Sequence, residues 1–467
     1  MAFCAIIIVM LNSKKRSYNK LKPVQMEDNY QDVELSDEQQ RVYNIMESTY
    51  DNMFITGKAG TGKSVLLQYF VHHTAKEVAV VAPTGVAALN VGGQTINSFF
   101  KIDLGVQNPK DEKKVTDFGG NQRKKLMKEL DTLVIDEVSM VRADLMDMID
   151  AKLKIARNNK EPFGGCQLIV FGDLYQLPPV VSDNQVLRYL KDKYGTIYFF
   201  GAPVIQSHPF RIIELQHVFR QKDAEFIEIL NSIRLGKVSS ELLADINNRC
   251  VRPPENKQYI TLTGRNMIAD RINQRNLNLL NSQLYSYDGT LQGDIKQSGL
   301  PTDMNLGLKV GAQVMMIKND RTHDPETGDS HPMRWVNGSL GTVSSLTSSE
   351  VEVKIGERRY KVNQEIWEKA KYDYDNQTKQ LEKTVVARFM QYPIKLAYAV
   401  TIHKSQGQTY DAVKIDLSSG AFATGQTYVA LSRCRSMSML YLTTPLRPRD
   451  IMVSPEVVKY MAGAEIE

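Results

Sequence analysis

Residues 57–64 form a glycine-rich segment that ends in an adjacent lysine and serine, Lys63 and Ser64. The spacing matches the phosphate-binding loop G-x-x-x-x-G-K-[ST], and an apolar run before it and a helical pattern after it favour this loop over an ordinary glycine-rich turn. Backbone N–H groups and a helix N-terminus would hold the phosphates of a nucleoside triphosphate. We expect Lys63 to reach the β- and γ-phosphates and Ser64 to bind Mg²⁺. The predicted nucleotide contacts are Gly57, Gly60, Thr61, Gly62, Lys63 and Ser64.

A second chemical feature is a pair of acidic residues, Asp136 and Glu137, directly after the apolar residues Leu133 to Ile135. Adjacent acids at a strand end are common on protein surfaces. In one sheet with a phosphate-binding loop, however, Asp136 would hold the Mg²⁺ shell and Glu137 would polarise an attacking water. The pair therefore predicts hydrolysis of the nucleotide as well as binding.

Three further polar side chains are candidates for contact with the nucleotide. Gln176 follows the apolar run 167–171 and could touch the γ-phosphate, although Gly172, Asp173 and the two prolines after Leu177 also suit a plain turn. Arg220 and Arg433 could stabilise charge in the transition state, but most arginines are surface ions and sequence position alone does not select these two.

The elements that must position these residues alternate between apolar strands and helical patterns. Short runs of continuous apolarity are typical of strands buried on both faces of a parallel sheet. One set of runs lies before about residue 205, a second set lies after it, and residues 310–392 read as short antiparallel strands. We expect an α/β protein with an N-terminal extension at 1–34, a first core at 35–204, a second core at 205–467 and a β insertion at 310–392. A polar segment at 101–130 is expected to be inserted in the first core.

Several ordered stretches give the chain a family resemblance that runs from Leu35 to about Leu446. The stretches include SDEQ at 36–39, the loop GKAGTGKS, APTGVAA at 82–88, GGQTINSF at 92–99, DEVSM at 136–140, PFGG at 162–165, GDLYQLPPV at 172–180, HVFRQ at 217–221, TIHKSQGQT at 401–409 and YVALSR at 428–433. With these stretches the chain resembles the Pif-one family of superfamily one B DNA helicases.

The resemblance implies two tandem RecA-like cores, a Src-homology-3-like barrel as the insertion and a wedge-like segment at 101–130. It also implies that Gln39 reads the adenine, that Gln176 couples the γ-phosphate to movement, and that Arg220 and Arg433 reach ATP from the second core. The implied activity is 5′-to-3′ translocation with unwinding of duplex DNA in replication, repair, recombination or telomere maintenance. The helical pattern at 145–156 falls in the signature region of the family and equally suits a packing helix.

The expected contacts to single-stranded or forked DNA lie in loops just after predicted strands. Their hydroxyl, amide, imidazole and ammonium groups can hold phosphates without reading bases. Phe99, Phe100 and Tyr392 could stack on bases, or could belong to the core. Asn97 stands where relatives often carry histidine. The predicted DNA-binding residues are Thr84, Thr95, Asn97, Phe99, Asn266, Thr401, His403, Lys404 and Ser405.

Composition bounds the remaining possibilities. The formal net charge of +5 is matched by the basic cluster before Glu27, so net charge does not argue for nucleic acid. Four scattered cysteines exclude a disulfide framework and fit a reducing cell interior. The apolar run Cys4 to Leu11 is too short to span a membrane. We interpret His72-His73 as a frayed helix end, and His323 with His331 as part of a solvated loop, and neither pair as metal ligands.

We therefore expect a monomer that is cytoplasmic if bacterial or phage-derived, and nuclear or mitochondrial if eukaryotic. Two alternatives stay open at this stage. One is a RecD-like or conjugative-type helicase, and the other is a nucleotide-gated protein that clamps DNA without translocating.

Overall fold

The computed structural model describes residues 34–467, apart from 294–299, 321–333, 375–380 and the positions 104, 182, 222, 252, 255–257, 319 and 336. The expected extension up to residue 33, with its apolar run, and both His323 and His331 lie outside the described residues.

The first core is a six-stranded parallel sheet with the order β3-β2-β4-β5-β1-β6. Its strands are β1 (Met53–Gly57), β2 (Val78–Ala82), β3 (Gln94–Thr95), β4 (Thr132–Ile135), β5 (Gln167–Phe171) and β6 (Arg211–Leu215). Every residue of β1, β4 and β5 is buried, as the continuous apolar runs predicted.

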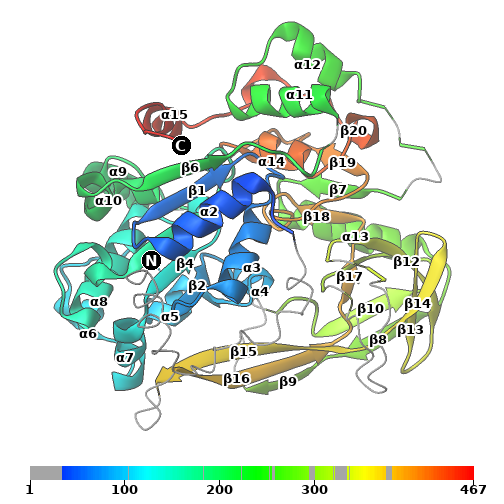
Figure 1. Ribbon diagram of the computed structural model, residues 1–467. Helices are drawn as coiled ribbons and strands as arrows, with labels where there is room; N and C mark the ends of the chain where they lie inside the picture. The colour runs from blue at the N-terminus through cyan, green and yellow to red at the C-terminus, as the bar shows by residue number, and fades with distance from the viewer. Residues whose placement is uncertain are drawn as a thin grey trace, which may run out of the picture.

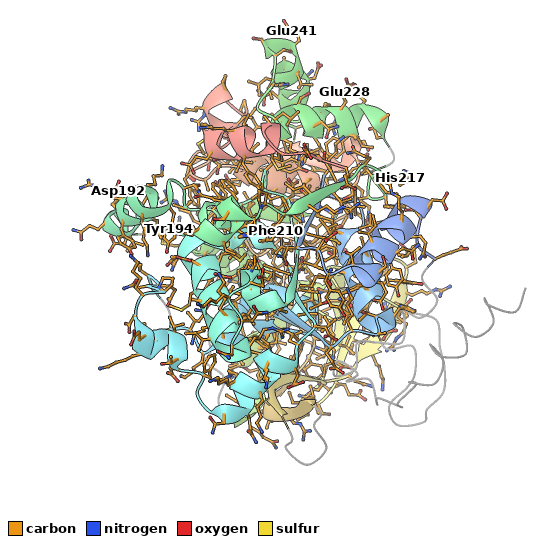
Figure 2. All side chains as sticks on the ribbon, turned by 60° about the vertical axis from the view of Figure 1, so that its left-hand side comes forward. Asp192, Tyr194, Phe210, His217, Glu228 and Glu241 are labelled. Atoms are coloured by element: carbon orange, nitrogen blue, oxygen red, sulfur yellow. The ribbon has the colours of Figure 1, made fainter. Side chains whose placement is uncertain are left out.

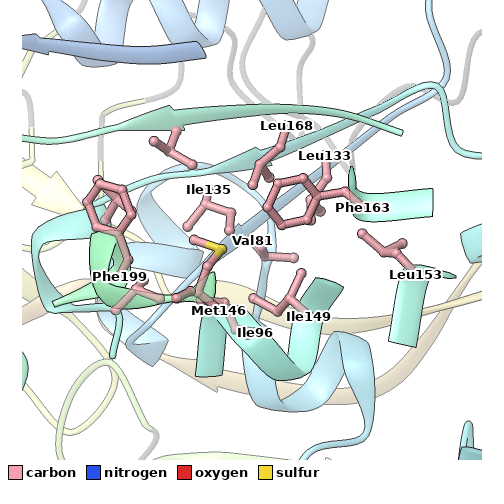
Figure 3. Close-up of a cluster of buried hydrophobic side chains, with 14 of the residues drawn as sticks. Val81, Ile96, Leu133, Ile135, Met146, Ile149, Leu153, Phe163, Leu168 and Phe199 are labelled. Atoms are coloured by element: carbon pink, nitrogen blue, oxygen red, sulfur yellow. The ribbon is translucent and has the colours of Figure 1, made fainter. Parts of the chain in front are cut away.

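Helices cover both faces of this sheet (Figure 1). The helices of this core are α2 (Asp37–Ser48), α3 (Lys63–His73), α4 (Gly85–Asn90), α5 (Ile96–Phe100), α6 (Glu112–Thr116), α7 (Asn121–Glu129), α8 (Ala143–Arg157), α9 (Asn184–Tyr194) and α10 (Pro203–Ser207). Helices α2 and α3 pack on one face. On the other face, Met146 and Ile149 of α8 contact the apolar cluster around Ile135 and Val81 (Figure 3).

The second core has a four-stranded parallel sheet with the order β18-β7-β19-β20. Its strands are β7 (Ile260–Thr263), β18 (Ala399–Thr401), β19 (Val413–Asp416) and β20 (Leu440–Leu442), and its helices are α11 (Ala224–Arg234), α12 (Ser240–Asn247), α13 (Asn266–Leu279) and α14 (Gln426–Ser432). Helix α11 buries Phe226 and Leu230, whereas Glu228 lies on its outer face, as does Glu241 on α12 (Figure 2).

Between β7 and β18 the chain forms antiparallel strands, as the pattern at 310–392 predicted. These strands are β8 (Leu284–Asp288), β9 (Thr290–Gly293), β10 (Asn305–Lys309), β11 (Gln313–Met316), β12 (Leu340–Leu346), β13 (Val351–Ile355), β14 (Arg358–Val362), β15 (Glu365–Tyr374), β16 (Leu381–Gln391) and β17 (Ile394–Leu396). Strands β8 to β10 precede residue 310 and still pair within this unit. The hairpin β15–β16 reaches from it to α7 of the first core (Figure 1).

The chain crosses between the two cores more often than the expected division at residue 205 implies. Strand β6 pairs with β1 over Met53↔Arg211 to Gly57↔Leu215, so the first sheet continues beyond that position. The C-terminal helix α15 (Pro455–Ala462) then returns, and Val457 joins the hydrophobic cluster of the first core. The two cores are therefore better defined by their two sheets than by the two expected segments, 35–204 and 205–467.

Polar side chains of α8 attach the inserted segment 101–130 to the first core. Lys152, which is 1% exposed, donates to the carbonyl oxygens of Lys114 (2.7 Å) and Asp117 (2.6 Å). Arg157 donates to the carbonyl oxygen of Leu130 (2.7 Å) beyond the end of α7. Helix α8 thus packs its apolar face against the first core, and its charged side chains form hydrogen bonds to the inserted segment.

In the described part of the chain, no helix is both long and apolar enough to cross a bilayer. Among the same residues, no three His, Cys, Asp or Glu side chains gather in a way that could hold a metal ion.

Candidate nucleotide and nucleic-acid sites

The glycine-rich loop joins β1 to α3 at the carboxyl edge of the first sheet. Gly62 caps α3 with φ of 77°, a left-handed conformation that favours glycine. A side chain on Gly60 would lie 2.5 Å from Cβ of Arg220, so a neighbouring loop also requires glycine there. Lys63 Nζ donates to the carbonyl oxygens of Gly57 (2.7 Å) and Lys58 (3.0 Å), and Ser64 is exposed in the first helical turn. The predicted lysine and serine therefore lie together at a helix N-terminus.

The acidic pair lies at the same edge, because β4 and β1 flank β5 in one parallel sheet. Asp136 Oδ1 accepts a hydrogen bond from the backbone N–H of Glu137 at 2.8 Å. Glu137 itself has φ of 52°, a left-handed conformation that is uncommon outside glycine. Such backbone strain concentrates at functional sites and persists only where the surroundings impose it.

Protein atoms surround these charged groups and shift their ionisation. Burial raises the pKa of Asp136 to about 7, with a further contribution from the charge of Glu137. Burial also raises the pKa of Glu137 and lowers the pKa of Lys63 to about 8. A bound cation would favour the ionised forms of Asp136 and Glu137 and so lower the pKa of both carboxyl groups. Mg²⁺ prefers oxygen ligands, so the Asp136 carboxylate and the Ser64 hydroxyl, both at the carboxyl edge of the first sheet, have the chemistry that this ion requires.

Both predicted arginines lie near the nucleotide site in space, although they are far from its other residues in the sequence. Arg433 is 1% exposed and donates to the carbonyl oxygens of Val429 (3.0 Å) and Gln408 (3.1 Å). Arg220 Nη1 donates to the carbonyl oxygen of Ser432 at 3.2 Å. Burial, and then the nearby charge of Arg433, lower the pKa of Arg220 to about 9. Burial also lowers the pKa of Arg433, and the charge of Glu137 partly opposes that shift. Arg220 lies in the loop that leaves β6 of the first sheet and leads to α11, so the expectation that it comes from the second core is wrong. Arg433, at the end of α14, is the cation of the second core that approaches Glu137.

The two predicted glutamines are both buried, but they have different partners. Gln39 is 4% exposed, and its Nε2 donates to the carbonyl oxygen of Gly62 at 3.3 Å. Its Oε1 accepts from the backbone N–H of Ser36, which completes a capping box at the start of α2. Gln176 is 7% exposed and accepts a hydrogen bond from Gln406 Nε2 at 3.4 Å.

A buried network across the cores escaped the sequence analysis. The hydroxyl of Tyr428 accepts from the backbone N–H of Ala59 in the phosphate-binding loop (2.9 Å) and donates to Asp173 (3.2 Å). Arg234 of α11 binds Asp173 at 3.2 Å and Glu214 at 3.2 Å. Ala59, Asp173 and Tyr428 stand in GKAGTGKS, GDLYQLPPV and YVALSR, whereas Arg234 and Glu214 lie outside these stretches. Nothing in a linear motif indicates which of these side chains will pair.

The predicted DNA-binding residues of the first core follow β2 and β3. Thr84, Asn97 and Arg142 line a pocket of about 190 Å³. Thr95 caps α5 by accepting from the backbone N–H of Ser98. Asn97 Nδ2 donates to the carbonyl oxygen of Ile102 at 3.1 Å, so part of its polar capacity is used within the protein.

Those of the second core follow β7 and β18, which are neighbours in the second sheet. Asn266 is exposed at the start of α13, and Lys404 is exposed beyond β18. Thr401 is buried, and its hydroxyl accepts from the backbone N–H of Lys404. Ser405 is fully buried and donates to the carbonyl oxygen of Ile402 at 2.9 Å, so its hydroxyl faces inwards in this conformation.

The aromatic side chains differ most from expectation. Phe99 is 2% exposed and packs edge-on against Phe100 in the first core, and Tyr392 is 4% exposed in the core of the β insertion. The stacking role expected for Phe99 is therefore wrong for this conformation, because its ring fills the hydrophobic interior. Phe422, which the sequence analysis missed, is 55% exposed and lies parallel to the His403 ring at 6.3 Å between centroids.

A phosphate-binding loop and an acidic pair on one parallel sheet, with arginines supplied by the connecting segment and by the second core, define the class of P-loop nucleoside triphosphatases. Comparison with known proteins then gives the family. Residues 34–243 match the model of the PIF1-like helicases. The ATP-dependent DNA helicase Pif1 of Bdellovibrio bacteriovorus is 33% identical over 92% of this chain and 92% of that protein. The chain belongs to the PIF1-like helicase family.

Solved structures of the family agree with this assignment. Bacteroides sp Pif1 in complex with ADP-AlF4 is 34% identical and superposes with a TM-score of 0.82, over 92% of this chain and 97% of that one. Bacteroides Pif1 bound to ssDNA is also 34% identical, over 92% and 97% of the two chains, with a TM-score of 0.65. Other curated relatives are longer, and this chain spans about half to two thirds of their length.

Proposed function

We propose that this protein is an ATP-dependent DNA helicase that translocates 5′-to-3′ on single-stranded DNA and unwinds duplex or forked DNA. The observation that carries the proposal is the meeting of two sheets at one buried cluster. Arg433 and Gln406 of the second core, and Arg220 of the segment that joins the two cores, approach the phosphate-binding loop and Glu137 of the first core. A site completed only when two cores meet can convert hydrolysis into relative motion of those cores.

In this proposal each residue at the cleft has a separate task. Lys63 and the loop amides bind the β- and γ-phosphates, and Gln39 lies beside the loop to contact the adenine. Ser64 and Asp136 would hold Mg²⁺, which neutralises phosphate charge when bound. Glu137 accepts the proton of the attacking water, and Gln176 senses the γ-phosphate. Arg220 and Arg433 stabilise the charge that develops during transfer.

The DNA is proposed to follow the edge formed by the residues after β2, β3, β7 and β18. Thr84, Asn97, Asn266 and Lys404 would contact the backbone, and Phe422 with His403 would stack on bases. Exposed aromatic rings beside polar groups are a usual platform for single strands. Sequence-independent binding of this kind suits a translocating enzyme.

The finer architecture also belongs to this proposal. We assign the two parallel-sheet cores as RecA-like domains, the antiparallel unit as a Src-homology-3-like barrel and segment 101–130 as the wedge that meets the duplex. We further propose a monomeric enzyme with roles in DNA repair and recombination. The family membership and the placement of β15–β16 against α7 support this reading.

The test compares ATP-dependent unwinding of duplexes that carry either a 5′ or a 3′ single-stranded tail. We expect unwinding only with the 5′ tail. The Glu137→Gln variant should bind ATP and DNA near wild-type strength and fail to unwind, because the amide is similar in size but is not a general base. Strand-stimulated ATP turnover without displacement would instead indicate a nucleotide-gated clamp.

A further inference from the structure

Gln406 occupies a position that links the two proposed sites. It belongs to the loop after β18, in which His403 and Lys404 face the proposed DNA edge, but its own side chain is only 8% exposed. Its Nε2 donates to Glu137 Oε2 at 2.8 Å and to Gln176 Oε1 at 3.4 Å. A residue of the second core therefore touches the proposed general base of the first.

The hydrogen bonds determine the orientation of the Gln406 amide. An ionised carboxylate only accepts hydrogen bonds, so the NH₂ group and not the oxygen must face Glu137. The amide oxygen of Gln406 is then buried, and among the described residues it has no hydrogen-bond partner. An unsatisfied buried acceptor costs about 1–3 kcal/mol, so a donor from outside the protein would be favoured there.

A water molecule about to attack the γ-phosphate is a donor of the required kind. It has two hydrogens, and Glu137 accepts only one of them. Glutamine amides orient the attacking water in other P-loop enzymes. We propose that Gln406 is a further catalytic residue whose amide nitrogen holds Glu137 while its amide oxygen accepts the second hydrogen of the attacking water.

The chemical step then balances without any additional reactant. The water oxygen forms a bond to the γ-phosphorus, and the bond from that phosphorus to the bridging oxygen breaks. The electron pair leaves with ADP, and the proton passes to Glu137. This inference rests on the proposed role of Glu137 and adds that the second core supplies the other partner of the water.

The position of Gln406 would also couple DNA binding to ATP hydrolysis. DNA that binds His403 and Lys404 would order the loop that carries Gln406 and so fix its amide beside Glu137. Stimulation of hydrolysis by single strands should therefore depend on Gln406, whereas binding of ATP and DNA should not.

The test measures steady-state and single-turnover ATP cleavage by Gln406→Leu, with and without single-stranded DNA. We expect the DNA-stimulated kcat to fall at least roughly 100-fold, the scale of removing one preorganised hydrogen-bonding group, while the KM for ATP and the Kd for DNA change less than about threefold. Gln406→Asn should lose nearly as much, because its shorter amide cannot span the distance. Retained stimulation in both variants would overturn the proposal.

Gln408→Leu is the matched control. Gln408 lies in the same loop and is 9% exposed, but its side chain accepts from the hydroxyl of Tyr410 and does not contact Glu137. Equal losses in Gln406→Leu and Gln408→Leu would indicate a disturbed loop and would contradict a catalytic role. Melting temperatures of all variants verify that each is folded.

A double variant separates this inference from the proposed function. If Gln406 and Glu137 act on one water, the double variant Gln406→Leu/Glu137→Gln should cleave ATP no more slowly than the slower of the two single variants. The reason is that rate losses are not additive for residues that act as one unit. Additive losses would overturn the shared role. Near-normal cleavage by Glu137→Gln alone would instead remove the general base from the proposed function.

Discussion

The ATP cleft and the DNA edge of this protein are built in different ways. At the cleft, Lys63, Asp136, Glu137 and Arg433 crowd together, and burial shifts the pKa of each of them. At the DNA edge, Asn266 and Lys404 are exposed to solvent, while Thr95 and Ser405 are engaged in hydrogen bonds within the protein.

This difference reflects what each ligand requires. Charge stabilisation in a transition state gains strength where water is excluded, so the groups at the cleft must be preorganised and dry. A backbone that slides past the protein must be held by many weak and exchangeable contacts. Substitutions at the cleft should therefore have larger effects than substitutions at the edge.

The largest effect is expected for Lys63→Ala. This change removes the lysine whose ammonium group lies against the loop carbonyl oxygens of Gly57 and Lys58. We expect ATP turnover and unwinding to be abolished, a fall of more than roughly 10³-fold that corresponds to more than about 4 kcal/mol of transition-state stabilisation. Turnover above about a tenth of wild type would contradict the assignment of this loop as the active site. Steady-state ATPase and strand-displacement assays measure both, and binding of single-stranded DNA without nucleotide should persist.

Arg433→Lys should have the next largest effect. Lysine keeps the positive charge but cannot reproduce the several hydrogen bonds that the guanidinium makes to Val429, Gln408 and Ser432. We expect DNA-stimulated hydrolysis to fall by roughly 10³-fold, at the lower end of arginine-finger effects, with ATP affinity much less affected. Equal losses in affinity and rate would point to a ground-state or packing role instead.

Phe422→Ala provides a direct probe of the DNA edge. Loss of one base-stacking ring should weaken binding of single strands by about 1–3 kcal/mol and leave DNA-independent ATP hydrolysis unchanged. Fluorescence anisotropy with labelled oligonucleotides measures the affinity. The matched contrast is Phe99→Leu, which should lower the melting temperature through lost core packing but should affect DNA affinity little, because Phe99 is buried.

Lys404→Ala should have the smallest effect. An exposed ammonium group that contacts phosphate contributes to all sequences alike, so affinity should fall uniformly across oligonucleotides of different base composition. The slope of log affinity against log salt should decrease by about one. A base preference that is present in the wild type and disappears in this variant would contradict the proposed phosphate contact. It would show that the DNA edge, like the cleft, recognises its ligand specifically.

Much of the cleft was predictable because its signals are local. A loop that cradles phosphate needs glycines, a lysine and a hydroxyl at fixed spacing, and a buried parallel strand needs continuous apolarity, so Gly57 to Ser64 and the strand before Asp136 could be found in the sequence. The DNA edge was less predictable, because Phe99 and Phe422 are both aromatic residues next to predicted elements. Only packing distinguishes a ring in the core from a ring on the surface.

The sequence by itself therefore determined several buried strands of both cores, the phosphate-binding loop, the acidic pair and the family. Tertiary structure decided that β6 and α15 join the first core, that Tyr428 bonds to Ala59, and that Gln406 bonds to Glu137. The physical reason is that these contacts join residues hundreds of positions apart along the chain, or depend on which neighbouring strand completes a sheet. Local propensity and periodicity carry no information about such distant partners, which meet only when the two cores pack together.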